Sequence, residues 1–375
     1  MSLSPLFKKS YYPLNTIEIS SSALLNNYRF LSGLTDDVTV APVLKSNAYG
    51  HGLTLVAKIL DSVSAPFFCV DSLYEAYELL KNKIKTPILI MGYVNPDNLK
   101  VKKLPFSYAI YDDALVAGIS RYQPQAGIHI FVDTGMHREG ISVEDLPGFL
   151  GYIKSFGNLK VEGLMSHLGV GENPATPGTK KQIENFKKAE EIVRQYDFAP
   201  VWRQIAASGA LLHNKDYKEN LGNVARCGIA LYGIDPEGKD LGHLQPALQL
   251  KTTLNQVKHV RKGEGVGYDF TFTAKKDMTI GILPLGYFDG VDRRLSNKGL
   301  VLVSNVACPI IGRVSMNLTT VDLSGVESPQ VGDEVIVFAN NPSSKNSIYN
   351  AALQCDIIPY ELLVHLYSST KRVIA

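Results

Sequence analysis

The stretch VTVAPVLKSNAYGHG at residues 38–52 opens the pattern that decides the fold. It begins as a short apolar run rich in β-branched residues, and it ends in a lysine followed by a turn with two glycines. Such a run is typical of a strand buried on both faces of a parallel sheet. Seven comparable runs follow along the chain, at residues 67–70, 87–92, 107–112, 129–135, 159–167, 202–208 and 223–233.

The segments between these runs carry apolar residues at helical spacing. The clearest are SLYEAYELLKNK at 72–83 and QIENFKKAEEIVRQY at 182–196. Eight buried strands that alternate with helices predict an α/β fold, a (β/α)8 barrel of the TIM type. We expect this barrel to occupy residues 1–245.

The pattern changes near residue 245. Alternating runs such as VLVSNV at 301–306 and DEVIVFA at 333–339 are separated by short turns, which predicts a mainly antiparallel β domain over residues 246–375. The N-terminal piece around 12–20, which includes NTIEIS, falls outside the eight runs. It is expected either to join the C-terminal domain or to cap the barrel.

The charge balance and the cysteines exclude several classes of protein. There are 38 Lys and Arg against 36 Asp and Glu, a net charge of +2, so we expect neither nucleic acid nor a membrane as a partner. No apolar run reaches the roughly 20 residues of a membrane span, and the N-terminus predicts no signal peptide. The cysteines form no CxxC pair, which favours reduced thiols in a cytoplasmic protein over disulfides or a metal site; they are Cys69, Cys227, Cys308 and Cys355.

Lys45 is the first candidate for chemistry. Enzyme sites in barrels lie where strands end, and Lys45 ends an apolar strand. A buried ammonium group is costly, so a lysine there is more stable as a Schiff base or as a neutral amine. The position of Lys45 does not by itself distinguish a catalytic lysine from one that is simply exposed to solvent at the end of its strand.

Six segments, in order, resemble the alanine racemase family, whose members bind pyridoxal phosphate in a barrel followed by a β domain. The resemblance covers essentially the whole chain. The segments are KSNAYGHG at 45–52, FVDTGMHREG at 131–140, GIALYG at 228–233, PLGYFDG at 284–290, GRVSMN at 312–317 and IPYELL at 358–363.

The resemblance implies two catalytic bases. Lys45 would hold pyridoxal phosphate and then act on one face of the substrate α-carbon, and Tyr268 in VGYDFTF would act on the other. A phenol with a pKa of about 10 is a poor base near neutral pH unless a cation lowers that value. Arg138 matches the family's arginine near the site.

The remaining implied roles concern the cofactor and the substrate. Arg226 would face the pyridine nitrogen; because arginine accepts no proton, the ring would stay neutral, which favours racemisation over transamination. Met316 would meet the substrate carboxylate through its amide. The other matched cofactor-binding residues are Tyr49, His167, Ser208, Gly228 and Ile229.

Four positions depart from the commoner family pattern. Phe131 stands where many members have a lysine, often carbamylated, that orients the arginine. Asn317 replaces an aspartate, Gln204 replaces a histidine that supports the pyridine-facing arginine, and Ser368, next to Tyr367, takes the place of a tyrosine that narrows the pocket. We therefore expect tolerance for serine or larger side chains.

The resemblance implies an amino-acid racemase that makes D-alanine for peptidoglycan, and a head-to-tail homodimer with shared active sites. The alternatives are a serine or broad-specificity racemase, a decarboxylase of related fold, a pyridoxal-phosphate carrier without activity, and a degenerate racemase. The acidic pyridine partner and the GPxCES-like segment of the decarboxylases are absent from the sequence.

Overall fold

A computed structural model describes residues 12–171, 173–213, 222–239 and 242–375. The described chain divides into two compact units, one within residues 21–246 and the other formed by residues 12–20 together with 247–375. None of the helices in the described ranges has the length and apolar character that a membrane crossing requires.

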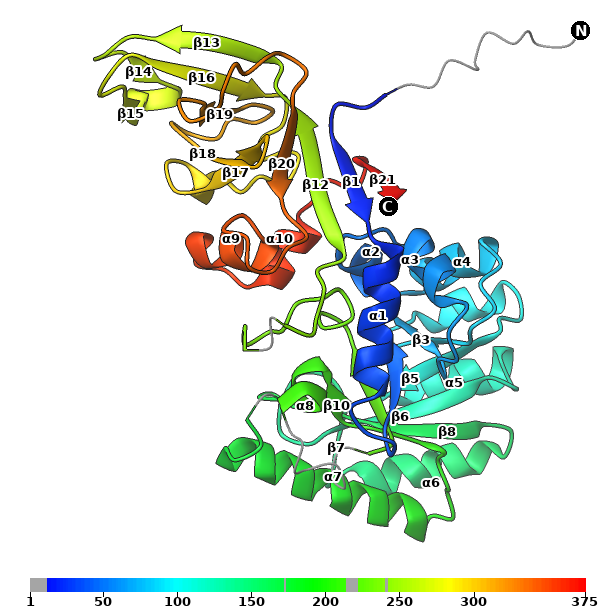
Figure 1. Ribbon diagram of the computed structural model, residues 1–375. Helices are drawn as coiled ribbons and strands as arrows, with labels where there is room; N and C mark the ends of the chain where they lie inside the picture. The colour runs from blue at the N-terminus through cyan, green and yellow to red at the C-terminus, as the bar shows by residue number, and fades with distance from the viewer. Residues whose placement is uncertain (1–11, 172, 214–221, 240–241) are drawn as a thin grey trace, which may run out of the picture. The chain divides into compact units, whose positions relative to one another are not determined.

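The first unit is the expected (β/α)8 barrel of parallel strands (Figure 1). One run of neighbours is β3-β4-β5-β6-β8-β9, and a second is β10-β11-β2. A parallel bridge between Val43 and Cys69 joins β2 to β3, and Ile205 alone separates β9 from β10, so the ring closes. The strands are β2 (Thr39–Pro42), β3 (Phe68–Val70), β4 (Ile88–Ile90), β5 (Phe106–Ile110), β6 (Gly127–Asp133), β7 (Ile141–Ser142, paired with β6), β8 (Lys160–Met165), β9 (Trp202–Gln204), β10 (Ala206–Ala207) and β11 (Val224–Cys227).

Helices surround these strands, and their starts follow from local sequence. Ser72 caps one helix by accepting the Glu75 amide, and Asp112 caps another by accepting the Leu115 amide. Figure 1 shows α6 and α7 packed side by side along the outside of the barrel. The helices of this unit are α1 (Ser21–Ser32), α2 (Lys45–Tyr49), α3 (Leu53–Leu60), α4 (Leu73–Lys81), η2 (Pro96–Lys100), α5 (Asp113–Tyr122), α6 (Leu146–Phe156), α7 (Pro177–Gln195) and α8 (Ser208–His213).

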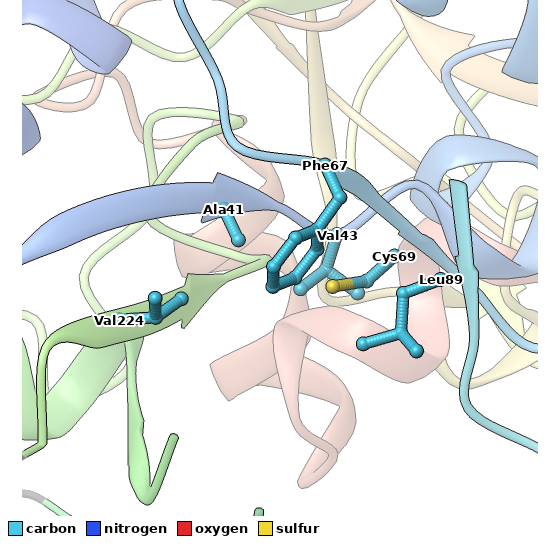
Figure 2. Close-up of a cluster of buried hydrophobic side chains, with 6 residues drawn as sticks. All are labelled: Ala41, Val43, Phe67, Cys69, Leu89 and Val224. Carbon is cyan, nitrogen blue, oxygen red and sulfur yellow. The ribbon is translucent and has the colours of Figure 1, made fainter. Parts of the chain in front are cut away.

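Apolar side chains fill the barrel interior in layers, as the twofold period of a strand requires. Figure 2 shows one cluster, in which the ring of Phe67 lies among side chains from β2, β3, β4 and β11. Its members are Ala41, Val43, Phe67, Cys69, Leu89 and Val224. Two residues further along β11 from Val224 comes Arg226, so the next position on the same face carries a charge.

The second unit is mainly antiparallel. Its largest sheet has the order β18-β17-β20-β12-β1-β21, in which β1 pairs antiparallel with β12 and parallel with β21. Two smaller sheets are β13-β16-β19 and β14-β15. The elements are β1 (Thr16–Ile19), β12 (Leu248–Thr253), β13 (Gln256–Val260), β14 (Gly265–Val266), η4 (Tyr268–Phe270), β15 (Phe272–Thr273), β16 (Met278–Leu283), η5 (Arg293–Leu295), β17 (Leu300–Val303), β18 (Val306–Pro309), β19 (Thr319–Asp322), β20 (Glu334–Phe338), α9 (Ile348–Cys355), α10 (Pro359–Val364) and β21 (Lys371–Ile374).

Candidate active site

Lys45 begins a turn of unusual handedness. Ser46, Asn47, Ala48 and Tyr49 all have φ between 50° and 57°, the left-handed region that costs roughly 1–2 kcal/mol for each residue other than glycine. The buried Glu75 carboxylate opposes this cost by accepting the amides of Asn47, at 3.2 Å, and of Asp71, at 2.9 Å. One side chain of α4 therefore fixes the loops that follow β2 and β3.

Lys45 is half-buried, and an acid lies beside its amine. The distance from Lys45 Nζ to Asp71 Oδ1 is 3.6 Å, and Asp71 directly follows β3. Both residues lie two positions beyond members of the interior cluster, Val43 and Cys69. The charged groups at this end of the barrel thus form the layer above the apolar one.

Arg226 is 5% exposed and is held by main-chain oxygens. Its Nη1 donates to the Gln204 carbonyl at 2.9 Å, and its Nη2 donates to the Ser166 carbonyl at 2.6 Å. Nη2 also lies 3.3 Å from Nδ1 of His167. Because arginine can only donate, Nδ1 of His167 must be the acceptor, which leaves a neutral imidazole.

The electrostatics of His167 agree with this hydrogen bond. Burial lowers the pKa of His167 to about 3, and the neighbouring cations Arg226, Arg138 and Lys45 act in the same direction. The imidazole is therefore neutral at any pH at which the protein would work.

Tyr49, Ser208 and the start of the GIALYG segment form a small polar cradle. Ser208 Oγ accepts the amides of Gly228, at 3.1 Å, and of Ala230, at 3.4 Å. A Cβ at Gly228 would lie 2.2 Å from the Tyr49 hydroxyl, so only glycine lets this phenol approach the backbone. The amide of Ile229, a residue 1% exposed, has no acceptor among the described residues. Burial raises the pKa of Tyr49, which keeps its hydroxyl a donor.

The loop after β6 carries Arg138. Asp133 Oδ1 accepts the amides of Gly135, Met136 and His137, at 2.9, 3.0 and 3.1 Å. Burial works against the Asp133 anion, but these three donors still hold the pKa of its carboxyl below the usual value. Arg138 donates from Nε to Oε2 of Glu139, and both side chains line a small pocket with Phe131 and His167.

Two of the four departures from the family pattern, Phe131 and Gln204, lie in the barrel. Phe131 belongs to an apolar cluster, and Gln204 makes buried hydrogen bonds. Phe131 packs with Ala109 and Met165, so it offers Arg138 no charge. The Gln204 side chain donates to Nδ1 of the buried His129 at 2.6 Å, whereas Gln204 supports Arg226 through its main-chain carbonyl. Burial lowers the pKa of His129 to about 4, so this histidine too is neutral.

Tyr268 and Met316 both lie in the second unit, on adjacent loops. Tyr268 is 68% exposed and Met316 is 55% exposed. Asp269, which follows Tyr268, pairs with Arg313 at 2.8 Å, and a Cβ at Gly312 would lie 2.7 Å from the Val266 carbonyl. The loops at 266–270 and 312–316 therefore support each other and present Tyr268 and Met316 on the surface of this unit.

Comparison with known proteins decides the family. Residues 19–236 match the family "Alanine racemase, N-terminal domain", and residues 247–374 match "Alanine racemase, C-terminal domain". The chain belongs to the alanine racemase family. It is therefore an isomerase of the racemase class, and the resemblance expected from the six segments is confirmed.

Full-length relatives support this membership of the alanine racemase family. An alanine racemase from Citrifermentans bemidjiense is 32% identical over 372 residues, which cover 95% of this chain and 97% of the relative. One from Borreliella burgdorferi is 33% identical and covers 92% of this chain and 95% of its own length.

Solved structures of alanine racemases share the fold. The alanine racemase from Bacillus anthracis with bound L-Ala-P has a TM-score of 0.88 and 28% identity, and the match covers 98% of this chain and 96% of that one. The enzyme from Bartonella henselae with covalently bound pyridoxal phosphate has a TM-score of 0.85 and 25% identity, and the match covers 97% and 100%. These matches confirm the barrel and β-domain architecture.

The other two departures from the family pattern lie in the second unit. Asn317 and Ser368 are exposed. The ring of Tyr367 packs on that of Phe288 at a centroid distance of 4.4 Å, and the Phe288 amide donates to the Met316 carbonyl at 3.0 Å. An aromatic pair thus lies next to the Met316 loop.

Sequence reasoning missed three acidic residues that contact the candidate groups. Glu75 and Asp71 lie outside the six segments, in an ordinary helix and loop; Glu139 lies in the FVDTGMHREG segment, but no role was assigned to it. Both Asp71 and Glu139 carry a weak sequence signal. Asp71 directly follows a barrel strand, and Glu139 lies on the loop after a barrel strand that carries Arg138.

Proposed function

We propose that this alanine racemase family member uses pyridoxal phosphate to interconvert L- and D-alanine by a two-base mechanism, with Lys45 and Tyr268 on opposite faces of the substrate. The observation that carries the proposal is the buried Arg226, fixed by two carbonyls beside a neutral His167 in the same barrel mouth as Lys45.

The residues of the barrel mouth fit pyridoxal phosphate. The Ile229 amide without an acceptor among the described residues, the Tyr49 hydroxyl and Ser208 Oγ supply donors for a phosphate group. The neutral His167 offers a flat face for a ring, and Lys45 offers the amine that bonds the cofactor. The covalently bound pyridoxal phosphate of the Bartonella henselae relative supports the same assignment.

When bound, pyridoxal phosphate would supply an electron-withdrawing group that acidifies the α-proton of an amino acid. Lys45 Nζ would hold the cofactor and then move this proton on one face. Arg226 would donate a hydrogen bond to the pyridine nitrogen without protonating it. The resulting weaker electron withdrawal favours return of the proton over transamination.

A second base on the other face is needed, because one base tends to return the proton to the side from which it came. Tyr268 Oη is proposed as this base, and the Met316 amide and Arg138 are proposed to bind the substrate carboxylate. The exposure of Tyr268 and Met316 on their own unit supports a head-to-tail homodimer in which the β domain of one subunit completes the site of the other.

Alanine is the proposed substrate, and the D-alanine that forms is proposed to be used for peptidoglycan. Serine is the second candidate, because Ser368 stands where members of the family carry a tyrosine that narrows the pocket. A cytoplasmic location is proposed on the four cysteines, all free and buried.

The test is deuterium exchange at the α-carbon in heavy water, with pyridoxal phosphate supplied. L-alanine, L-serine and L-lysine are compared by NMR and by chiral chromatography. Exchange coupled to racemisation of L-alanine supports the proposal. Racemisation of L-serine at a higher kcat/KM would change the substrate, and exchange without racemisation would reject the two-base mechanism.

A further inference from the structure

We propose that Glu139 is the positioning residue for Arg138, and that it aims the guanidinium at the carboxylate of the substrate. The inference rests on the proposed function, which assigns Arg138 to carboxylate binding. The Arg138 side chain is long, cationic and 49% exposed, so a partner is needed to hold its guanidinium in one orientation.

The backbone around Arg138 is fixed on both sides, whereas the side chain needs a partner of its own. Asp133 accepts three amides just before Arg138, and β7 pairs with β6 just after it. The Asn185 side chain of α7 also donates to the Thr134 carbonyl, at 2.9 Å. These contacts place the Arg138 Cα but leave the rotatable bonds of its side chain undetermined.

The other pocket neighbours cannot orient the guanidinium by charge. Phe131 is apolar, and His167 is neutral. The Asp133 carboxylate is taken up by the three amides and by His137, whose Nδ1 lies 3.3 Å from its Oδ2. In the described part of the chain, Glu139 is the acidic side chain that forms an ion pair with Arg138.

The geometry of the pair leaves the ligand-binding end of Arg138 available. Glu139 Oε2 accepts the hydrogen of Nε, which leaves the two terminal NH2 groups to bind a carboxylate. Glu139 also lies near Tyr111, the residue that directly follows β5. Burial and then the negative charge of Glu139 raise the pKa of Tyr111.

An ion pair as exposed as this one adds little to the free energy of unfolding. We therefore expect its loss to change ligand affinity rather than stability. Misplacing a binding group by a small distance can cost far more in a site than the pair contributes to the fold. We therefore expect Glu139 to act only through Arg138.

The experiment is a double-mutant cycle with Glu139→Gln, Arg138→Ala and the double variant, each as holoenzyme. The first readout is the dissociation constant of propionate, a carboxylate with the carbon chain of alanine but no amine, by titration calorimetry. The second is kcat/KM for L-alanine. Glu144→Gln, at an exposed acid between β7 and α6, is the matched control.

Glu139→Gln is expected to weaken propionate binding about five- to tenfold, with an unchanged melting temperature, and to have no effect when Arg138 is already alanine. Glu139→Asp should give an intermediate loss, and Glu144→Gln none. Equal loss in both backgrounds, no loss in either, or no propionate binding by the wild type would overturn the proposal. If the wild type binds propionate but does not racemise alanine, the proposed function fails while the propionate cycle still tests the Arg138–Glu139 coupling.

Discussion

Replacing Glu75 with glutamine would remove the charge that holds the left-handed turn after Lys45. The carboxylate accepts the Asn47 amide at 3.2 Å with Oε1 and the Asp71 amide at 2.9 Å with Oε2. A glutamine keeps one acceptor and turns an NH2 group toward the second amide, so one of these hydrogen bonds is lost and replaced by two facing donors.

The magnitude follows from the loss of one charge-assisted hydrogen bond at a residue that is 9% exposed. Such a bond contributes roughly 1.5–3 kcal/mol, so the free energy of unfolding should fall by about 2–3 kcal/mol. For a domain of this size the melting temperature should drop by roughly 5–10 °C. The strained turn would also open more often, which should slow the attachment of pyridoxal phosphate to Lys45.

Urea unfolding followed by circular dichroism measures the first effect, and the rise of visible absorbance after pyridoxal phosphate is added to apoenzyme measures the second. Glu78→Gln is the control, because Glu78 lies on the same helix and its carboxylate forms a long, 4.0 Å pair with Lys81. A Glu75→Gln protein with the wild-type urea midpoint and the wild-type rate of attachment would show that the Glu75 carboxylate does not hold this turn.

Three further results are expected. Lys45→Ala should lose racemisation and the visible absorbance of lysine-attached pyridoxal phosphate, while Lys58→Ala, at an exposed position of α3, should keep both; retained absorbance in Lys45→Ala would contradict the assignment. Burial lowers the pKa of His129 to about 4 and of His167 to about 3, so below about pH 6.5 the unfolded chain binds protons that the folded chain does not. Stability should therefore fall with decreasing pH by up to about 1.4 kcal/mol per pH unit for each histidine, and His129→Gln should flatten the dependence of the urea midpoint between pH 7 and 5; an unchanged slope would be inconsistent with a buried neutral His129. Finally, dilution should lower specific activity in parallel with dimer dissociation, and a fully active monomer in sedimentation would exclude a shared site.

The order of the barrel strands was predictable because each is a short apolar run bounded by polar or turn residues. The interior cluster of Figure 2 follows from the twofold period of these runs, which points Ala41 and Val43 toward the barrel interior. On β11 the same period points Val224 and Arg226 inward. The interruption between β9 and β10 at Ile205 was not predictable, because WRQIAAS reads as one strand.

The handedness of the turn after Lys45 had no sequence signal. A positive φ is usually marked by glycine, and residues 46–52 contain glycine only at 50 and 52. Ser46 to Tyr49 nevertheless also have positive φ values. The contact that holds it comes from Glu75, in a different βα unit, and helical periodicity gives no information on which buried acid reaches a neighbouring loop. For the same reason the pairing of Arg138 with Glu139 required side-chain geometry.

Lys45 and Tyr268 are proposed to act on opposite faces of the α-carbon. The most direct test is Tyr268→Phe holoenzyme in heavy water, with α-proton exchange of L-alanine and of D-alanine measured separately by NMR. We predict that the cofactor stays bound, that D-alanine still exchanges through Lys45, and that L-alanine exchange is lost. Exchange of both enantiomers at wild-type rates would contradict the two-base account.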